Sequence, residues 1–277
     1  MAEKETKNEQ KDMVEPIPEE VEKLEKEIEK KKEELPTEPE KEIDFRKLSP
    51  LQRRARREAE AQKQAIENWI PKTKMGKLVK AGKEKNLDKI LETGKKILES
   101  EIVDMTLPNI QSDLILIGQA KGKFGGGKRR AWRQTQKKTK EGNILTFSCM
   151  AVVGDKNGHI GVGMGKAKET LPSREKALRN ARLNIMRINR GFENPEPDSD
   201  DPHTVPYIVE GKSASVKIKL MPAPRGTGLV VADECKKVLK LAGIKDVYGV
   251  SRGHTRTTFN LVKACVKALS KTKSLKF

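Results

Sequence analysis

The chain has few of the residues on which catalytic and metal sites usually depend. Its 277 residues include three cysteines and three histidines, and aromatic residues make up only 4% of the sequence. Cys149, Cys235 and Cys265 lie far apart without CxxC spacing, which argues against a disulfide framework and a structural zinc site. We therefore expect buried free thiols, histidines in ordinary structural or surface roles, and no metal or other cofactor.

Long apolar runs are missing as well. No stretch approaches the roughly 18 apolar residues that a membrane-spanning helix requires. The first residues are acidic and charged rather than typical of a signal or transit sequence. The sequence therefore predicts a soluble, cytoplasmic protein without a membrane partner.

Charge is abundant and unevenly distributed. The formal net charge is +18, yet residues 1–44 carry nine Lys or Arg against seventeen Asp or Glu. The remaining 233 residues carry 49 basic against 23 acidic residues, a net charge of +26. This surplus predicts a polyanionic partner. Composition alone does not distinguish between RNA, DNA and an anionic membrane surface. Residues 1–44 are predicted to form a disordered acidic extension, because they combine low hydrophobicity with high charge.

The densest positive charge lies in residues 121–142, where nine basic residues accompany one acid, Glu141. Glycines let this backbone approach a partner closely, and Phe124 and Trp132 are interleaved among the charges. Basic side chains along an accessible face neutralise phosphates and release counterions, which gives salt-sensitive binding to nucleic acid. The alternative is a solvated basic linker. The residues of this stretch predicted to bind RNA are Lys128, Arg129, Arg130, Arg133, Lys137, Lys138 and Lys140.

The chain is predicted to have an α+β fold with two compact units that follow a helical and basic extension over residues 45–127. In that extension, residues 45–68 are expected to form a helix with Ser49 as its cap and Pro50 in its first turn. Its cluster of four arginines, residues 53–57, is interpreted equally well as an RNA contact or as a solvated face. Residues 87–99 also have a helix-like pattern.

The first compact unit, residues 128–192, is predicted to be β-β-β-α. The expected elements are an edge strand at 130–139, a buried strand at 144–153, an Asn-Gly hairpin turn at 155–158 and a glycine-rich strand at 159–165. A helix is expected from Leu171 onward. Its predicted apolar face consists of Leu171, Leu178, Ala181, Ile185 and Ile188, and basic residues, including Arg179, Arg182 and Arg187, line its other faces.

The second unit, residues 203–277, is predicted to be β-β-α-β-α. Paired strands are expected at 204–209 and 215–220, the second with Val216, Ile218 and Leu220 facing inward. A loop at 221–228 is expected to open a helix that Gly243 ends. A short strand at 244–248 and a last helix at 258–270 complete the prediction.

The segment GVGMGKAKE, residues 161–169, does not have the spacing of a phosphate-binding loop. A Walker sequence ending at Lys166 would need glycine at Ile160 and Ser or Thr at Ala167. The glycines are better explained by close approach to a sugar-phosphate chain or to a neighbouring element, with Lys166 and Lys168 as RNA-binding candidates. Because no catalytic constellation emerges elsewhere, the chain is not expected to be an enzyme.

Several ordered motifs resemble a known family. NILTFSCMAVVGDKNGHIGVGMGKAKE, SREKALRNARLNIMRI and MPAPRGTGLVVADECKKVLKLAGIKDVYGVSRG closely resemble the universal ribosomal protein S-five family of the small subunit. WIPKTKMGKLVKAGK and PHTVPYIVEGKSASVKIKLMPAPRGTG are similar to its archaeal and eukaryotic branch, whose eukaryotic member is called S-two. The resemblance covers about residues 69–275.

The resemblance implies a unit related to double-stranded-RNA-binding domains, followed by a C-terminal unit of the family's own type. It also implies a structural constituent of the small subunit that binds rRNA, stabilises the head–body junction and supports translational accuracy. The implied partners are small-subunit rRNA, ribosomal proteins S-four and S-eight, and mRNA on the side where it enters. Residues 137–143 would contact rRNA, residues 161–168 would lie near RNA backbone, and residues 225–231 would face S-four.

Two further expectations accompany the resemblance. Because one helix face can bury only part of the run from Leu229 to Val231, Leu229 or Val230 is expected to project outward. The predicted protein interface consists of Arg225, Thr227, Leu229 and Val230, and the alternative is that the run packs entirely on its own sheet. Some archaeal relatives have cysteines after the basic helix, whereas this chain reads GFENPEPDSDDPH there, so no metal is expected. The functional alternative is a free RNA-binding regulator or RNA chaperone.

Overall fold

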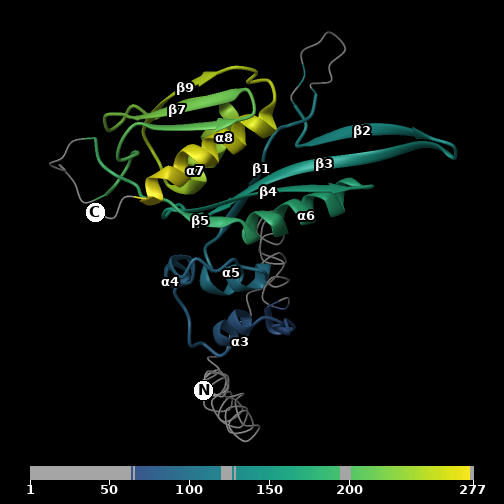
Figure 1. The fold of residues 1–277 in the computed structure, drawn as a ribbon, viewed down its shortest axis with the longest axis horizontal. Helices are drawn as coiled ribbons and strands as arrows, with labels where there is room; N and C mark the ends of the chain where they lie inside the picture. The colour runs from purple at the N-terminus through teal and green to yellow at the C-terminus, as the bar shows by residue number, and fades with distance from the viewer. Residues whose placement is uncertain (1–63, 65, 120–126, 128, 194–200, 275–277) are drawn as a thin grey trace, which may run out of the picture. The chain divides into compact units, whose positions relative to one another are not determined.

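The computed structural model describes residues 64, 66–119, 127, 129–193 and 201–274 (Figure 1). The acidic extension predicted over residues 1–44, most of the helix predicted over 45–68, Phe124 and Lys128 lie outside the described residues. The chain divides into two units, Met1–Glu60 and Ala61–Phe277, and the second unit contains every described residue.

Three short helices precede the first sheet: α3 (Lys74–Lys80), α4 (Leu87–Glu92) and α5 (Ser100–Thr106). They pack around a small core that also includes Ile185. The carboxylate of Glu99 accepts hydrogen bonds from the backbone N–H groups of Lys72 and Thr73 at 2.9 and 2.7 Å, which fixes the chain before α3. The prediction of one helix over 87–99 was wrong, because the backbone leaves the helix at Gly94, whose φ is +71°.

The N-terminal sheet is entirely antiparallel. Its strands are β1 (Gln111–Leu114), β2 (Trp132–Thr139), β3 (Gly142–Gly154), β4 (His159–Ala167) and β5 (Ile185–Arg187), and α6 (Thr170–Leu183) lies between β4 and β5 in the chain. The sheet order is β1-β3-β4-β5, and β2 also pairs with β3. The predicted succession of three strands and a helix is therefore present. Strands β1 and β5 were not predicted.

Helix α6 packs directly on the glycines of β4. These glycines therefore allow the close approach of a neighbouring element, which was one of the two roles considered for them. A Cβ at Gly161, Gly163 or Gly165 would clash with the backbone of α6. The buried positions of the helix are correspondingly small: Ser173, Ala177 and Ala181. The predicted apolar face of this helix was right at Leu178 and Ala181 and wrong elsewhere, since Leu171 is 63% exposed and Ile185 and Ile188 follow the end of the helix. The prediction followed the large apolar residues, whereas close packing of α6 on β4 requires small residues at the contact.

The turn between β3 and β4 lies at the predicted place but has a different conformation. A type I′ Asn-Gly turn requires positive φ at both residues, whereas the positive φ values occur at Lys156 and Gly158. The carboxylate of Asp155 accepts hydrogen bonds from the backbone N–H groups of Asn157 and His159 at 2.7 and 3.1 Å. These two bonds to the carboxylate therefore take the place of some of the backbone–backbone hydrogen bonds of a tight hairpin turn.

The C-terminal sheet has the order β6-β7-β9-β8. Its strands are β6 (Val209–Ser213), β7 (Val216–Pro222), β8 (Leu229–Val230) and β9 (Val247–Arg252), and β8 runs parallel to β9. Helices α7 (Asp233–Ala242) and α8 (Thr258–Ser270) follow β8 and β9 respectively, and a 3₁₀ turn, η2 (Lys271–Ser274), follows α8. Both helices pack with this sheet in one hydrophobic core. None of the helices within the described part of the chain is long and apolar enough to cross a membrane.

Several predictions for this sheet are confirmed and others are wrong. Val216, Ile218 and Leu220 are buried, Gly243 ends α7 with φ +83°, and α8 has the predicted bounds. The strand predicted at 204–209 lies instead at Val209–Ser213, because Pro206 has no N–H group to donate to a ladder. The strand predicted at 244–248 begins later, at Val247, and β8 was missed.

One continuous core joins the two sheets. Met150 and Val152 of β3 belong to the same buried cluster as Val238 and Leu241 of α7. The backbone N–H of Lys156 also donates to the carbonyl of Leu241 at 2.9 Å. The three cysteines are buried and free, as predicted. A hydrogen bond with Cys235, together with burial, raises the pKa of the Cys265 thiol, which disfavours its reactive thiolate form.

Candidate RNA interface

The β2–β3 hairpin extends from the N-terminal sheet as a two-stranded arm (Figure 1). The pairing runs from Trp132 opposite Cys149 to Thr139 opposite Gly142 at the tip. Side chains toward the tip are exposed on both strands. Because an isolated two-stranded ribbon is only marginally stable in water, this arm is suited to being held by a partner.

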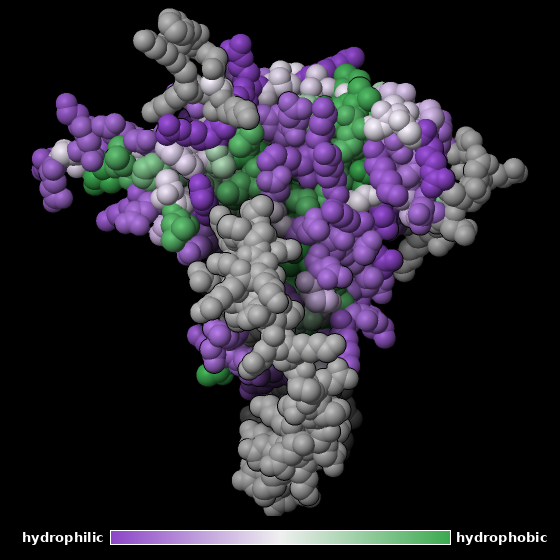
Figure 2. Space-filling view, turned by 180° about the vertical axis from the view of Figure 1, so that it is seen from behind, coloured by the Kyte–Doolittle hydropathy of each residue, from purple (hydrophilic) through white to green (hydrophobic). Residues whose placement is uncertain are grey.

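The arm carries exposed cations and exposed apolar side chains together. Arg133, Lys137, Lys138 and Lys140 are all exposed, and none forms an ion pair with any described residue. Ile144 and Leu145 are 42% and 39% exposed. Figure 2 shows hydrophobic and hydrophilic side chains side by side along this arm. Phosphates would neutralise the cations, and the apolar groups would lie against sugars or bases.

Strand pairing determines which predicted RNA-binding residues share a face. Arg133 lies opposite Ser148, and Ser148 lies opposite Lys166. Residues opposite one another in a ladder point to the same side of a sheet, and neighbouring strands are about 4.8 Å apart. Arg133 and Lys166 therefore lie about 10 Å apart on one face, and Lys137 follows on the same side of β2.

The remaining candidates on β4 and α6 are distributed differently. Lys168 is exposed just beyond β4, and Arg179 is exposed on α6, which covers the other face of the sheet. Arg182 forms an ion pair with Asp104 of α5 at 2.9 Å and is half-buried. Burial raises the pKa of Asp104, although the Arg182 charge opposes this shift. The positive charge of Arg182 is therefore partly neutralised within the protein.

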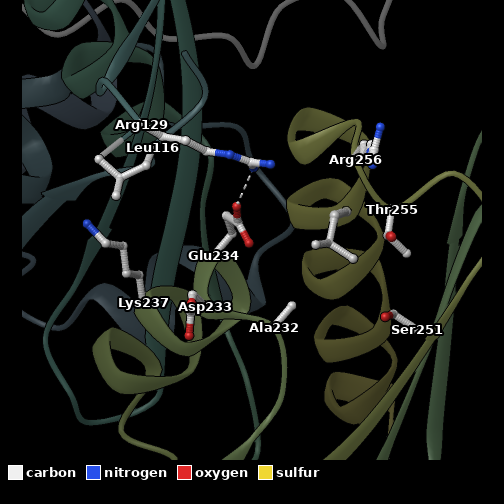
Figure 3. A pocket seen from close by; sticks show the side chains of 10 residues that line it. Leu116, Arg129, Ala232, Asp233, Glu234, Lys237, Ser251, Thr255 and Arg256 are labelled. Atoms are coloured by element: carbon white, nitrogen blue, oxygen red, sulfur yellow. Dashed lines mark hydrogen bonds and ion pairs between the residues drawn. The ribbon is translucent and has the colours of Figure 1, made fainter. Parts of the chain in front are cut away.

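The two arginines that precede β2 have protein partners. The guanidinium of Arg130 lies over the ring of Trp132, 4.9 Å from its centroid. Nη1 of Arg129 lies 3.1 Å from Oε1 of Glu234, in the first turn of α7 (Figure 3). Sequence reasoning missed this pair because the two residues are 105 positions apart.

A second ion pair strengthens the same junction. Nζ of Lys237 lies 2.9 Å from Oδ1 of Asp113 and also donates to the carbonyl of Leu114 at 2.8 Å. Lys237 therefore ties α7 to β1. Figure 3 shows the Arg129–Glu234 pair and the side chain of Lys237 around a cleft of about 560 Å³. The arm is thus anchored on a body whose two sheets are joined by charge as well as by apolar packing.

Comparison with known proteins agrees with this architecture. Residues 131–189 match the model of the ribosomal protein S5 N-terminal domain, and residues 211–276 match that of the ribosomal protein S5 C-terminal domain. The first range contains the arm and α6, and the second contains most of the C-terminal sheet with both of its helices.

The chain is also similar over most of its length to archaeal proteins named "Small ribosomal subunit protein uS5". It is 48% identical to that of Nanoarchaeum equitans over 206 residues, which are 74% of this chain and 88% of the relative. It is 44% identical to that of Hyperthermus butylicus over 207 residues, or 74% of this chain and 90% of the relative. The protein of Thermoplasma volcanium is 43% identical over 206 residues, or 74% and 86%.

The chain belongs to the ribosomal protein S5 family. It is of the archaeal type, as the sequence predicted. The family is a structural, non-enzymatic component of the ribosome, so the chain is a ribosomal constituent that acts in the cytoplasm.

The loop of this S5-family chain that was predicted to contact another protein precedes β8. Arg225 is exposed, Thr227 and Leu229 are half-buried, and Val230 is 51% exposed. Val230 therefore projects outward as expected, but the helical reason given for it was wrong. Leu229 and Val230 form β8, and alternation along a strand places their side chains on opposite faces of the sheet.

His159 was predicted to have an ordinary structural or surface role, and it lies in a partly buried charged cluster. Its Nδ1 lies 2.6 Å from Oδ2 of Asp155, and its Nε2 lies 2.9 Å from Oδ1 of Asp88 in α4. Burial lowers the pKa of His159, but hydrogen bonds to the two carboxylates outweigh it, so the pKa is raised. Nη1 of Arg187 also reaches Asp88, at 3.4 Å. Among the described residues, no group of His, Cys, Asp or Glu is arranged to hold a metal ion.

Proposed function

We propose that the chain binds rRNA as a structural constituent of the small ribosomal subunit. The observation that carries this proposal is the β2–β3 arm, whose exposed lysines and arginine lie beyond the protein core. Family membership supports the ribosomal setting, and the positive charge supports RNA as the partner. The fold then acts as a scaffold that places basic groups where RNA segments converge.

The finer parts of the proposal follow from the family resemblance. The N-terminal sheet with α6 would act as a unit related to double-stranded-RNA-binding domains. The protein would stabilise the junction of head and body, border the side where mRNA enters, and support translational accuracy. Its protein neighbours would be S-four and S-eight, with Arg225, Thr227, Leu229 and Val230 on the S-four side.

Binding titrations against small-subunit rRNA at several salt concentrations test the role of the arm. We expect a variant with Lys137→Ala, Lys138→Ala and Lys140→Ala to bind more weakly and to lower the log–log salt slope by about 2–3, since each lost phosphate contact removes roughly 0.7–0.9. The matched control replaces three exposed lysines of the C-terminal region, Lys212, Lys217 and Lys263, with alanine. Equal effects of the two variants would show that net charge, not the arm, governs binding.

Sedimentation of the tagged full-length chain from cells tests the ribosomal assignment. Stoichiometric recovery in small subunits supports the proposal. Recovery as free or mRNA-associated protein would favour the alternative, an RNA-binding regulator or RNA chaperone that uses the same arm.

A further inference from the structure

A cleft of about 460 Å³ lies at the root of the arm, between β2 and the start of α8. One wall comes from Arg130 and β2, and the other comes from the loop that leads from β9 into α8. Buried Ile117 and Thr258 belong to its lining. The cleft is therefore built by both sheets, and the core that they share holds its walls together.

The charge of this cleft is positive and unopposed. Arg130, Arg133 and Arg256 line it, and its described lining residues include no aspartate or glutamate. Arg133 and Arg256 form no ion pair with any described residue. The neighbouring cleft in Figure 3, which shares Arg256, is different, because it also contains Asp233 and Glu234. Three permanently charged guanidinium groups without a counter-charge favour an anionic ligand.

The rest of the lining suits a nucleobase. Trp132 and Phe259 are half-buried aromatic side chains, and the guanidinium plane of Arg130 already lies over Trp132. Three amide side chains, those of Gln119, Gln134 and Gln136, supply both hydrogen-bond donors and acceptors. Unpaired RNA bases are recognised by stacking on aromatic rings or guanidinium planes and by hydrogen bonds to their edges.

The size and position of the cleft select one kind of nucleic acid. A duplex does not fit a space of this size, whereas one unstacked nucleotide does. The cleft is continuous with the arm, because β2 runs from Trp132 in its wall to Lys138 near the tip, a span of about 20 Å. Phosphates held along the arm and a base at its root would belong to the same RNA segment.

We infer that this cleft binds a single unpaired nucleotide of RNA, with its base among the aromatic and amide groups and its phosphate at Arg256. The inference rests on the RNA-binding function proposed above and adds a specificity to it. The arm binds backbone without regard to pairing, whereas the cleft selects RNA that has an extruded or bulged nucleotide next to a helix.

The test uses the full chain and two RNA hairpins, one fully paired and one with a single bulged 2-aminopurine. We expect tighter binding of the bulged RNA, with a change in 2-aminopurine fluorescence as the base enters the cleft. Arg256→Ala and the double variant Gln134→Ala, Gln136→Ala are expected to weaken binding of the bulged RNA by about tenfold and that of the paired RNA by less than twofold. All three side chains are exposed, so folding is expected to be retained and is checked by thermal melting.

The control variant Lys137→Ala, Lys138→Ala separates the cleft from the arm. It is expected to weaken binding of both RNAs by the same factor. Equal affinity for the two hairpins, or equal effects of Arg256→Ala on both, would overturn the cleft assignment while leaving RNA binding by the arm intact. Adenosine monophosphate binding as tightly as the bulged RNA would overturn it too, because the site would then belong to a free nucleotide. Failure to bind either hairpin would contradict the proposed function itself.

Discussion

Nη1 of Arg129 lies 3.1 Å from Oε1 of Glu234, so an arginine predicted to bind RNA pairs with a carboxylate of the opposite sheet's helix. The side chain of Arg129 is 44% exposed, which leaves solvent on one side of the pair. Its charge is nonetheless shared with Glu234, unlike that of Arg133, which has no described ion-pair partner. The two arginines therefore differ in their ion-pair partners although the sequence places them in one basic run.

This difference predicts unequal salt effects. Replacing Arg133 with alanine should lower the log–log salt slope of rRNA binding by about 0.7–0.9, because one phosphate contact is lost. Replacing Arg129 with alanine should lower the slope much less, since its partner is Glu234. The measurement is a set of binding titrations across salt concentrations with each variant. Equal slopes for the two variants would mean that Arg129 exchanges Glu234 for phosphate in the complex.

A second prediction concerns the contact between β4 and α6. A Cβ at Gly163 would clash with the backbone of Ala177 and Ala181, so Gly163→Ala must push the helix away from the sheet. We expect a loss of about 1–3 kcal/mol or more in the free energy of unfolding, measured by urea denaturation. Met164→Ala, at the exposed neighbouring position of the same strand, is the control and should change stability little. Tolerance of Gly163→Ala would show that the helix is not held this closely.

The same contact explains what the sequence could and could not predict. Helix α8 was predicted correctly because its buried side is marked by large apolar residues, among them Leu261, Val262 and Leu269. The buried side of α6 is marked by small residues, whose meaning depends on the glycines of the strand beneath them. A sequence pattern does not record such complementary packing between two segments.

The missed strands and site residues have a related cause. Strand β1, with the sequence QSDL, has no alternation of its own and is fixed by pairing with β3 and by the contacts of Lys237 in α7. The basic arm was predictable, because charge density and a turn are local features. The clefts and the Arg129–Glu234 pair were not, since they combine residues that are distant in the chain.

His159 gives a prediction for pH. Its folded pKa is raised above the usual 6.5, so its contribution to stability is fully present below about pH 6.5 and is lost as pH rises through the folded pKa. The pKa of Asp155 is instead lowered. Burial opposes this shift, but the hydrogen bonds from His159 and the backbone outweigh it, so the Asp155 contribution is lost as pH falls through its folded pKa. The cluster should therefore stabilise the fold most between these limits.

Thermal melting from about pH 5 to pH 9 checks this expectation. The melting temperature of the natural chain should fall on the alkaline side, and His159→Gln should remove most of that dependence. Asp88→Asn should reduce it only in part, because the carboxylate of Asp155 remains beside His159. An unchanged pH profile in His159→Gln would assign the dependence to other groups.

The last prediction concerns the loop before β8, where an exposed Arg225 accompanies an exposed Val230. Val230 lies next to Tyr248 in the parallel pair with β9, so both contribute to one exposed area of the sheet. If this area contacts S-four, Arg225→Glu should weaken that contact and alter decoding accuracy. The stability of the isolated protein should barely change, because an exposed charge substitution costs little by itself. The matched control is Lys212→Glu, an exposed charge reversal on β6. A misreading assay on assembled subunits and a melting curve of each isolated variant provide the two measurements. A large loss of stability with unchanged accuracy would place this loop within the protein's own structure and contradict the interface.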